Sequence, residues 1–483
     1  MDELTGRASR AAMWSGIEAW GRRLGSVVIF VLLARLLEPE DFGLAAIALV
    51  FVLILGMIQY SGPIRALVQY DEVSDEDLHT GFWLGLLFAL VMVVVLLVTA
   101  PWLASAFGEP RLSAILRVGS LALVAGSAAT VPTALMMREL DFRSLALRSI
   151  GATVGSGILA VVLAVLGAGV WALIWQNVTF SAIQTALVWS RTPYRPRPSL
   201  GRSQARRLFS MSWRFAGADL LMVSDKRFAD LAIGGLLGTA ALGFYSVAYR
   251  FLDVLSSLFV EAVSNVSRPL FARVQGEPAR LLNGVTVALR QSAVISFPAF
   301  VGMAVMAHEI TVVVFGAQWQ PSVPVMRLLA IVGLLTVVEA LLTNAIAGVG
   351  QVSWHLWARS GFAIGNIAVI LPVILVSGDI VAVAGAMVAW RLLYLPVYLR
   401  VLHRALPYRL LPLARSVAGP AGASLLMAGC VVAARGAVGW SPTPTSLIAG
   451  IVLGAATYAL AIVVLDRTAV REAVTLVRRA VSG

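Results

Sequence analysis

The sequence predicts an all-α, polytopic membrane protein with about fourteen transmembrane helices. Hydrophobic residues make up 59% of the 483 residues and charged residues only 13%, whereas soluble domains average about 25% charged residues. Nearly the whole chain consists of apolar segments of roughly 20 to 28 residues, long enough to cross a bilayer. These segments lack the alternating polarity of transmembrane strands, so helices are predicted. Little chain remains for a soluble domain.

The apolar segments give the order of the spans. The first contains Glu18, Arg22 and Arg23, lacks a cleavable signal pattern and is interpreted as a retained span. The ninth is long, and it either kinks at Pro298 or includes an interfacial turn. The predicted spans are 11–36, 41–62, 79–105, 112–136, 144–167, 169–190, 207–236, 240–265, 281–315, 322–349, 352–376, 380–400, 412–434 and 445–466.

Basic residues gather in alternate loops, which predicts the orientation of the spans. The opposite set of loops holds only Arg111 and Arg435. Both termini are therefore predicted to lie in the cytoplasm. The net charge of +12 does not indicate nucleic acid, because these arginines lie between spans and favour contact with membrane lipid instead. The arginine-rich loops contain Arg7, Arg10, Arg65, Arg138, Arg143, Arg191, Arg195, Arg197, Arg202, Arg206, Arg268, Arg273, Arg280, Arg404, Arg409, Arg467, Arg471, Arg478 and Arg479.

The chain repeats itself weakly at an offset near 200 residues. The run from Leu36 to Gly43 corresponds to the run from Leu236 to Gly243, and Phe107-Gly108 with Arg117 corresponds to Phe315-Gly316 with Arg327. A duplicated unit of six spans keeps its orientation, which implies two lobes related by an axis along the membrane normal. The predicted organisation is a lobe at 1–190, a cytoplasmic linker at 191–206, a lobe at 207–403, and two extra spans with a tail at 404–483.

The seventh span is unusual because it carries six ionisable side chains within an apolar stretch. A charge at the bilayer centre costs a few kcal/mol, so these groups are expected to face protein or water. The span therefore predicts a polar route through the interior of the molecule. The six residues are Arg214, Asp219, Asp225, Lys226, Arg227 and Asp230.

Several runs resemble the bacterial Wzx-like flippases of the multidrug/oligosaccharidyl-lipid/polysaccharide exporter superfamily. The resemblance covers spans 1 to 10 in order. One departure is that Phe228-Ala229 precedes Asp230, where family members commonly have an Asn two residues before this aspartate. The runs that carry the resemblance are Ala34-Arg35-Leu36-Leu37-Glu38-Pro39-Glu40-Asp41-Phe42-Gly43, Leu140-Asp141-Phe142-Arg143, Gly169-Val170-Trp171-Ala172-Leu173, Ile233-Gly234 through Arg250, and Phe315-Gly316-Ala317-Gln318-Trp319.

This resemblance implies a fold of two six-helix lobes around a central cavity. It also implies that an undecaprenyl-diphosphate-linked oligosaccharide is the substrate, moved from the cytoplasmic to the outer leaflet for exopolysaccharide, capsule or lipopolysaccharide assembly. A polysaccharide polymerase and glycosyltransferases are the expected partners. Alternating access by rocking of the lobes is the expected mechanism.

The buried charges have a structural and a functional interpretation. In the structural one, opposite charges three or four residues apart on a helix neutralise each other, as for Glu18 with Arg22, Lys226 with Asp230, and Arg250 with Asp253. The functional one is that cations bind the diphosphate, because the arginine fork suits phosphate. Arg23, Lys226 and Arg227 have no acid so obviously assigned to them. The predicted substrate-binding residues are Arg22, Arg23, Arg214, Lys226, Arg227 and Arg250, and those for ion coupling or gating are Asp219, Asp225, Asp230 and Glu339.

Two other classes of function compete with this prediction. A multidrug or ion antiporter shares the fold, although the number of cations favours an anionic substrate. A membrane glycosyltransferase or polymerase usually needs an extended outer loop, and here the outer loops are short. No catalytic residue, cofactor or metal site is predicted: the four histidines are isolated, and the only lysine, Lys226, does not follow a glycine as in a nucleotide-binding loop. Cys430 is the only cysteine, which excludes an intrachain disulfide.

Overall fold

The computed structural model describes the backbone of most of the chain. The described residues are 2–69, 73–274, 277–349, 352–406, 410–468 and 472. Within them, the account of side chains excludes 2–12, 58–66, 69, 211–226, 262, 265–266, 268–270, 272, 278, 352, 355, 405 and 410.

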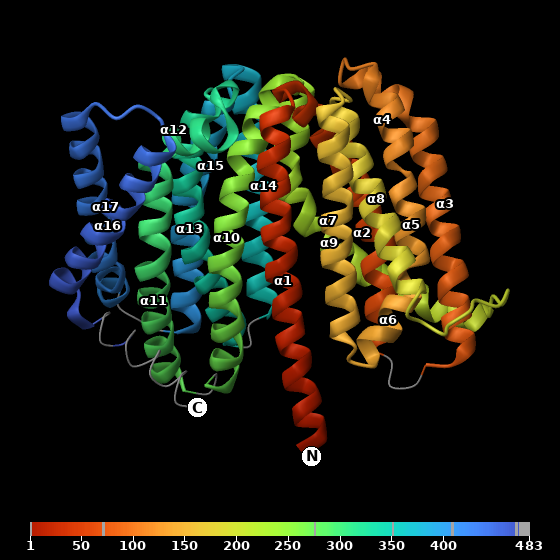
Figure 1. Ribbon diagram of the computed structural model, residues 1–483. Coiled ribbons are helices and arrows are strands. Elements are labelled where there is room, and N and C mark those ends of the chain that lie inside the picture. The colour runs from red at the N-terminus through yellow and green to blue at the C-terminus, as the bar shows by residue number, and fades with distance from the viewer. Residues whose placement is uncertain are drawn as a thin grey trace. The chain divides into compact units, whose positions relative to one another are not determined.

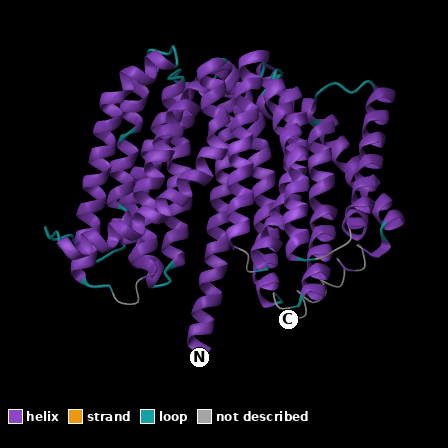
Figure 2. Ribbon diagram, turned by 180° about the vertical axis from the view of Figure 1, so that it is seen from behind, coloured by secondary structure: helices purple, strands orange, loops and turns teal. Residues whose placement is uncertain are grey.

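The described residues form helices joined by short loops, with no strand among them (Figures 1 and 2). They divide into two compact units, Met1–Gly243 and Phe244–Gly483. The helices before the boundary are α1 (Asp2–Leu36), α2 (Pro39–Gln69), α3 (Asp75–Ala106), α4 (Arg111–Gly119), α5 (Leu121–Ala128), α6 (Thr130–Arg138), α7 (Phe142–Val165), α8 (Val170–Trp189) and α9 (Arg202–Leu236). Those at and after it are α10 (Thr239–Arg273), α11 (Pro278–Val305), α12 (Ala307–Ile310), η1 (Thr311–Phe315), η2 (Ala317–Trp319), α13 (Ser322–Gly348), α14 (Val352–Ser377), α15 (Ile380–Ala405), α16 (Leu410–Val438) and α17 (Pro444–Leu465).

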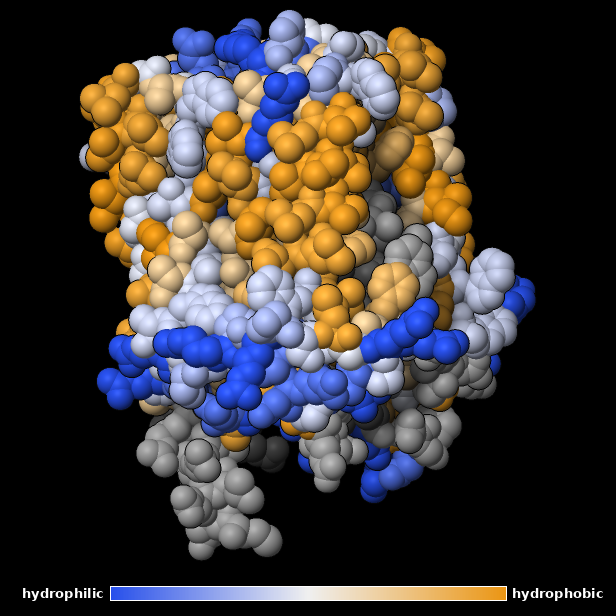
Figure 3. Space-filling view, turned by 90° about the vertical axis from the view of Figure 1, so that its right-hand side faces the viewer, coloured by the Kyte–Doolittle hydropathy of each residue, from blue (hydrophilic) through white to orange (hydrophobic). Residues whose placement is uncertain are grey.

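The predicted all-helical membrane fold is confirmed, and each of the fourteen predicted spans coincides with a helix or a run of short helices. Ten segments of the described chain are long and apolar enough to cross a membrane. Figure 3 shows one face of the first unit, where a broad apolar band is bordered below by a belt of hydrophilic side chains. The boundary between the two units falls after Gly243, so α9 belongs to the first unit. The division into lobes of six spans each stays a prediction.

The fourth predicted span is broken into α4, α5 and α6. Pro132 has no N–H, so the carbonyl oxygen of Ala128 loses its helical donor. The indole Nε1 of Trp189 on α8 donates to that carbonyl instead, at 3.0 Å. One turn earlier, the Thr185 hydroxyl donates to the Ala125 carbonyl at 2.6 Å. Polar side chains of α8 thus satisfy the backbone groups that the break leaves free, as an apolar surrounding requires.

The ninth predicted span continues through Pro298 as α11 and ends at Val305. A turn at Met306 leads into α12 and the π-helical η1, which ends at Gly316 with φ of +115°. Of the two alternatives, the turn is therefore the observed one. Gly108, the repeat partner of Gly316, also has a positive φ, of +66°. This match supports the internal duplication.

The first unit packs through small residues. Residues Gly21 and Gly25 of α1 lie against Ile150 and Thr153 of α7, and Gly157 of α7 lies against Ile29 of α1. Residue numbers rise together along both helices, so α1 and α7 run parallel, as the predicted orientation of spans 1 and 5 requires. Small residues permit this close approach, which supplies packing energy where lipid removes most of the hydrophobic driving force.

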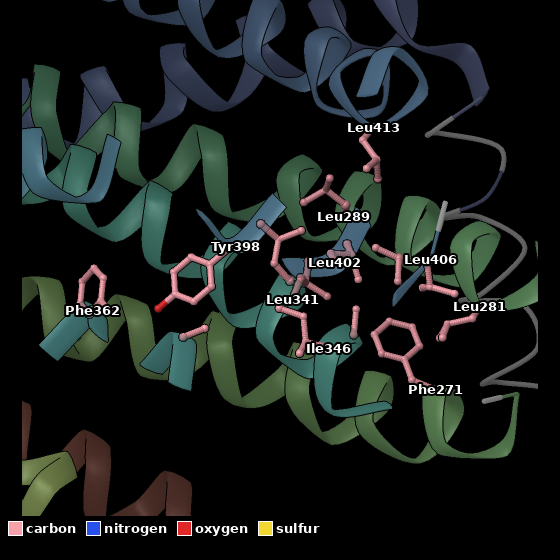
Figure 4. Close-up of a cluster of buried hydrophobic side chains, with 14 residues drawn as sticks. Phe271, Leu281, Leu289, Leu341, Ile346, Phe362, Tyr398, Leu402, Leu406 and Leu413 are labelled. Carbon is pink, nitrogen blue, oxygen red and sulfur yellow. The ribbon is translucent and has the colours of Figure 1, made fainter. Parts of the chain in front are cut away.

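The second unit is built around a buried apolar cluster that draws on six helices, α10, α11, α13, α14, α15 and α16 (Figure 4). Around it, α11 packs on α13 and α16, and α15 packs on α13 and α14. The two predicted extra spans, α16 and α17, pack on each other, and α16 packs on α11. They are therefore part of the second unit.

Candidate functional site

The charged residues of α1 lie on the helix that packs against α7. Arg22 is exposed, whereas Glu18 and Arg23 are half-buried. One helical level lower, the guanidinium of Arg143 lies 5.7 Å from the centre of the Trp14 ring, a cation–π arrangement. Cations thus lie at two levels near the predicted cytoplasmic half of α1, Arg22 and Arg23 on α1 itself and Arg143 on α7.

The charged segment of α9 is partly described. Arg227 Nη1 lies 3.0 Å from Asp230 Oδ2, one helical turn away, and the side chains of these residues are 38% and 7% exposed. The suggestion that Arg227 lacks an acid was therefore wrong: Asp230, assigned above to Lys226, bonds to it. A buried carboxylate needs such a partner, because an isolated charge costs several kcal/mol. Arg214, Asp219, Asp225 and Lys226 belong to the helical backbone of α9, but their side chains lie outside the described residues.

Packing fixes where the Arg227–Asp230 pair lies. The helix α9 packs on α2 and α3. A turn beyond Asp230, Gly234 lies directly against Ile47 and Leu242. Ile233, next to it, is fully buried. The carboxylate is therefore held where the helix enters its packed C-terminal part, and the guanidinium of Arg227 is the more exposed member of the pair.

Charged residues of the second unit include Arg250 and Asp253 on α10, both half-buried. A third predicted residue, Glu339 on α13, is 8% exposed. Its carboxylate Oε2 accepts from Arg391 Nη1 of α15 at 2.5 Å. The guanidinium of Arg391 also lies 5.0 Å from the centre of the Phe362 ring. Glu339 is therefore part of an ion pair that ties α13 to α15.

Sequence reasoning missed the cation of that pair and two further ion pairs between separate helices or segments. Glu309 of α12, 2% exposed, accepts from Arg435 of α16 at 2.9 Å. Arg290 of α11 lies 3.1 Å from Glu472, beyond α17. The signal was present, because Arg290 and Arg391 each interrupt an apolar segment. The prediction attended to spans 1, 7 and 8 and overlooked these single charges.

Arg117 and Arg327, which occupy matching places in the repeat, are both exposed. Each follows a fully buried apolar residue, Leu116 and Met326 respectively. The two positions therefore share their burial pattern as well as their place in the repeat. Among the described side chains, no group of three or more His, Cys, Asp or Glu is placed to hold a metal ion.

The predicted cationic residues are distributed over both units. The first unit provides Arg22, Arg23 and Arg227 on α1 and α9, and the second provides Arg250 on α10. Guanidinium groups bind phosphate through paired N–H donors and keep their charge in apolar surroundings. Described carboxylates on these helices include Glu18, Asp253 and Asp230, and Asp230 is held by a charge-assisted bond to Arg227 that another anion would have to replace.

Comparison with known proteins agrees with this picture. The family model for polysaccharide biosynthesis protein matches residues 32–324. The chain is 29% identical to succinoglycan biosynthesis transport protein ExoT of Rhizobium meliloti (strain 1021), over 72% of this chain and 71% of that protein. It is 25% identical to lipopolysaccharide biosynthesis protein WzxC of Escherichia coli (strain K12), over 74% and 73%. These relatives confirm the resemblance to Wzx-like proteins.

A solved structure shares the fold. The lipid II flippase MurJ, in an inward closed conformation, superimposes with a TM-score of 0.74 over 94% of this chain and 99% of that one, at 13% sequence identity. The family match covers more than half of the chain. The chain therefore belongs to the polysaccharide biosynthesis protein family.

Proposed function

We propose that this protein is a transporter that flips undecaprenyl-diphosphate-linked oligosaccharide repeat units across the bacterial inner membrane. The repeat units would serve exopolysaccharide, capsule or lipopolysaccharide assembly. Support comes from relatives named for succinoglycan transport and lipopolysaccharide biosynthesis, and from the fold shared with a lipid II flippase. Both termini are proposed to lie in the cytoplasm, and a polymerase and glycosyltransferases are the proposed partners.

The observation that carries the proposal is the set of cations at membrane depth. A lipid-linked diphosphate must bring its negative charge through the apolar core, and arginine is the residue best suited to accompany it. We assign diphosphate binding to the residues on α1, α9 and α10. They are Arg22, Arg23, Arg214, Lys226, Arg227 and Arg250.

The bond between Arg227 and Asp230 suggests how binding is linked to movement. In the structure, Asp230 neutralises Arg227 at 3.0 Å. An incoming diphosphate competes for the guanidinium and releases the carboxylate. Alternating access requires that the substrate favour one state by only a few kcal/mol, which one exchanged charge-assisted bond can supply. Asp230 is thus proposed as a gating residue.

The carboxylates proposed for ion coupling fall into two groups. Asp230 and Glu339 each lie beside a guanidinium, an arrangement that suits gating or cross-linking of helices. The other group, Asp219 and Asp225, is proposed to exchange the coupling ion or proton during transport. The multidrug or ion antiporter remains the alternative function, but clustered cations fit an anionic substrate better than a cationic drug.

The test is a flipping assay with purified protein in vesicles and defined undecaprenyl-diphosphate-linked sugars, with and without an ion gradient. Arg227→Gln is expected to slow flipping about tenfold or more, since one charge-assisted bond to phosphate contributes about 1.5–3 kcal/mol. Arg280→Gln is the matched control, because Arg280 is exposed and pairs only within its own helix turn with Glu277.

Two results would contradict the proposal. One is wild-type protein that is inserted and folded but moves no lipid-linked sugar under any gradient. The other is efflux of a fluorescent cationic drug from the same vesicles without sugar transport, which would establish the antiporter instead. Equal rates for Arg227→Gln and Arg280→Gln would remove Arg227 from the binding site and leave the transport function standing.

A further inference from the structure

The segment 191–201, which joins α8 to α9, is fixed to the start of α3 (Figure 1). The hydroxyl of Tyr194 donates to the Leu78 carbonyl at 3.1 Å. The Tyr194 ring lies in an apolar cluster with Phe82 and Trp189, at centroid distances of 6.4 Å and 6.2 Å. The aromatic ring of Tyr194 thus anchors the middle of the segment to the helical body.

Backbone groups of the segment also hold it in place beyond this anchor. The indole Nε1 of Trp83 donates to the Arg197 carbonyl at 2.8 Å, and the Arg197 N–H donates to His79 Nδ1 at 3.3 Å. Further on, the Gly201 N–H donates to the Thr80 hydroxyl at 3.0 Å. Because several side chains of α3 form hydrogen bonds with its backbone, the segment is held against this helix.

The segment alternates between buried and exposed residues. Thr192 and Tyr194 are buried, whereas Arg191, Arg195 and Arg197 are exposed. Alternation of this kind is what an extended chain produces, since successive side chains point to opposite sides. Arg195 further stabilises the extended form by donating to the carbonyls of Thr192 and Tyr194, at 3.0 Å and 2.8 Å. One side of the segment is therefore a row of arginines.

Two exposed arginines at the start of α9 continue the row, and we call the whole set the arginine strip. None of its members forms an ion pair with a carboxylate of the described chain. Of the three acids in the first turn of α3, Asp77 bonds to Arg207 at 2.6 Å and Glu76 accepts from Gln204 at 2.9 Å. Asp75, which is exposed, is the third. Five arginines face this one further acid of the described α3 turn, so the strip keeps a net positive charge. Its members are Arg191, Arg195, Arg197, Arg202 and Arg206.

The strip lies alongside α3 and not beyond its end. Trp83, which holds the Arg197 carbonyl, is eight residues into the helix from Asp75, or about 12 Å along its axis. Trp83 and Trp189 are the residue type that settles at the membrane–water boundary. On the first unit, Figure 3 shows the apolar band ending at a hydrophilic belt. The arginines thus lie at the depth of lipid headgroups.

We propose that the arginine strip is a binding surface for acidic phospholipid headgroups. Guanidinium groups bind phosphate, and basic residues near an anionic leaflet gain favourable energy from its surface potential. A soluble acidic protein is a poorer occupant, because the strip runs beside the first turns of α3 and does not project past the helix ends. Docking of the segment holds the cations in a row, so little conformational freedom is lost when headgroups bind.

The test uses the full-length protein in nanodiscs and measures retained lipid by native mass spectrometry. Dioleoylphosphatidylglycerol is compared with dioleoylphosphatidylcholine at several salt concentrations. The wild type is expected to retain phosphatidylglycerol preferentially, with a preference that salt reduces. Neutralising the strip with Arg191→Gln, Arg195→Gln, Arg197→Gln, Arg202→Gln and Arg206→Gln together is expected to weaken this retention about tenfold or more.

The matched control removes the same charge elsewhere, from exposed arginines of the second unit. Retention in this control is expected to stay within about twofold of the wild type, since distant charges are screened. Equal losses in both variants, or a loss in neither, would overturn the proposal. So would stronger binding of soluble polyglutamate than of phosphatidylglycerol. The control substitutions are Arg273→Gln, Arg280→Gln, Arg404→Gln, Arg415→Gln and Arg467→Gln.

A second variant separates the docked geometry from the charge. Tyr194→Ala removes the anchor and keeps all five arginines, so it is expected to weaken phosphatidylglycerol retention several-fold. Unchanged retention would show that the docked segment contributes nothing to the site. None of these measurements depends on transport, so their outcome is independent of whether the protein flips a lipid-linked sugar.

Discussion

Gly43 and Gly243 make reciprocal contacts: Gly43 lies against Thr239, and Gly243 lies against Pro39. A Cβ added to Gly43 would overlap the carbonyl oxygen of Thr239, and one added to Gly243 would overlap the carbonyl oxygen of Pro39. Both glycines lie one turn inside their helices, α2 and α10, and each meets the first residue of the other helix. The two glycines are 200 residues apart in the sequence, and so are the first residues of the two helices, Pro39 and Thr239. The reciprocal crossing is the geometry that a duplicated unit related by a twofold axis produces.

The crossing predicts that neither glycine tolerates a side chain. Gly43→Ala and Gly243→Ala are each expected to destabilise the purified protein by about 1–3 kcal/mol, because the added methyl group meets backbone that cannot rotate away. Thermal unfolding in detergent measures the effect. Gly385→Ala is the control, since no atom lies within 4 Å of its Cβ position. Equal melting temperatures for Gly43→Ala and Gly385→Ala would contradict this account of the crossing.

The buried pair of Glu339 and Arg391 predicts a different pattern of destabilisation. Arg391→Met is expected to cost about 3–5 kcal/mol, because it leaves the Glu339 carboxylate buried without its cation. Adding Glu339→Leu is expected to restore most of the loss, since two apolar groups of similar volume replace the pair. The measurement is again thermal unfolding. If the double variant is as unstable as Arg391→Met, the ion pair is not the cause.

The orientation can be tested through the docked segment 191–201. Cys430, the one native cysteine, is exposed and is first replaced by serine. Cysteine at Leu200, which is 62% exposed, is then expected to react with a membrane-impermeant thiol reagent only after the inner face is opened. Arg111→Cys, on the predicted outer side, is the positive control. Ready labelling of position 200 from outside would reverse the predicted orientation.

The spans could be predicted because length and apolarity alone define them, and lipid makes no finer demand on most of their residues. The break in the fourth span could not. Its apolar pattern is continuous, and the donors that make the break tolerable, Thr185 and Trp189, lie about 60 residues further along the chain. Pro132 was the only local sign of it.

The candidate site was less predictable than the fold. Spacing along one helix suggests ion pairs three or four residues apart, and it found the neighbourhood of Asp230 but did not assign Arg227, an observed partner, to it. Pairs between helices leave no such trace: Glu339 and Arg391 are separated by 52 residues, and Glu309 and Arg435 by 126. Only packing of the helices brings these charges together.

Tyr194 gives a prediction for alkaline pH. Burial, and then the negative charge of Asp75, raise the pKa of its phenol from 10.0 to about 12. The folded protein therefore holds this proton more tightly than the unfolded chain does. Stability is unaffected below pH 10 and is lost as pH rises from about 10 to about 12. A phenolate difference spectrum between wild type and Tyr194→Phe measures the titration. Ionisation of Tyr194 near pH 10 would contradict its buried position.

The break in the fourth span can be tested directly, because different residues cause it and stabilise it. Pro132 removes the helical N–H, and Trp189 bonds to the carbonyl that is left free. Trp189→Phe removes the donor to the Ala128 carbonyl and keeps an aromatic ring. The expected cost is about 1–3 kcal/mol, since a partly buried carbonyl loses its partner. Pro132→Ala supplies an N–H at the position where a helix would satisfy the same carbonyl. In that background, Trp189→Phe is expected to cost much less, because the backbone replaces the indole.

A double-mutant cycle of thermal or denaturant unfolding measures this coupling between Trp189 and Pro132. Replacing Trp171 with Phe, at the opposite end of α8, serves as the control for general effects of losing an indole. A coupling energy near zero would mean that the Ala128 carbonyl does not depend on Trp189. A clear coupling would show that α8 stabilises the break in the neighbouring span by taking over the hydrogen bond that Pro132 removes.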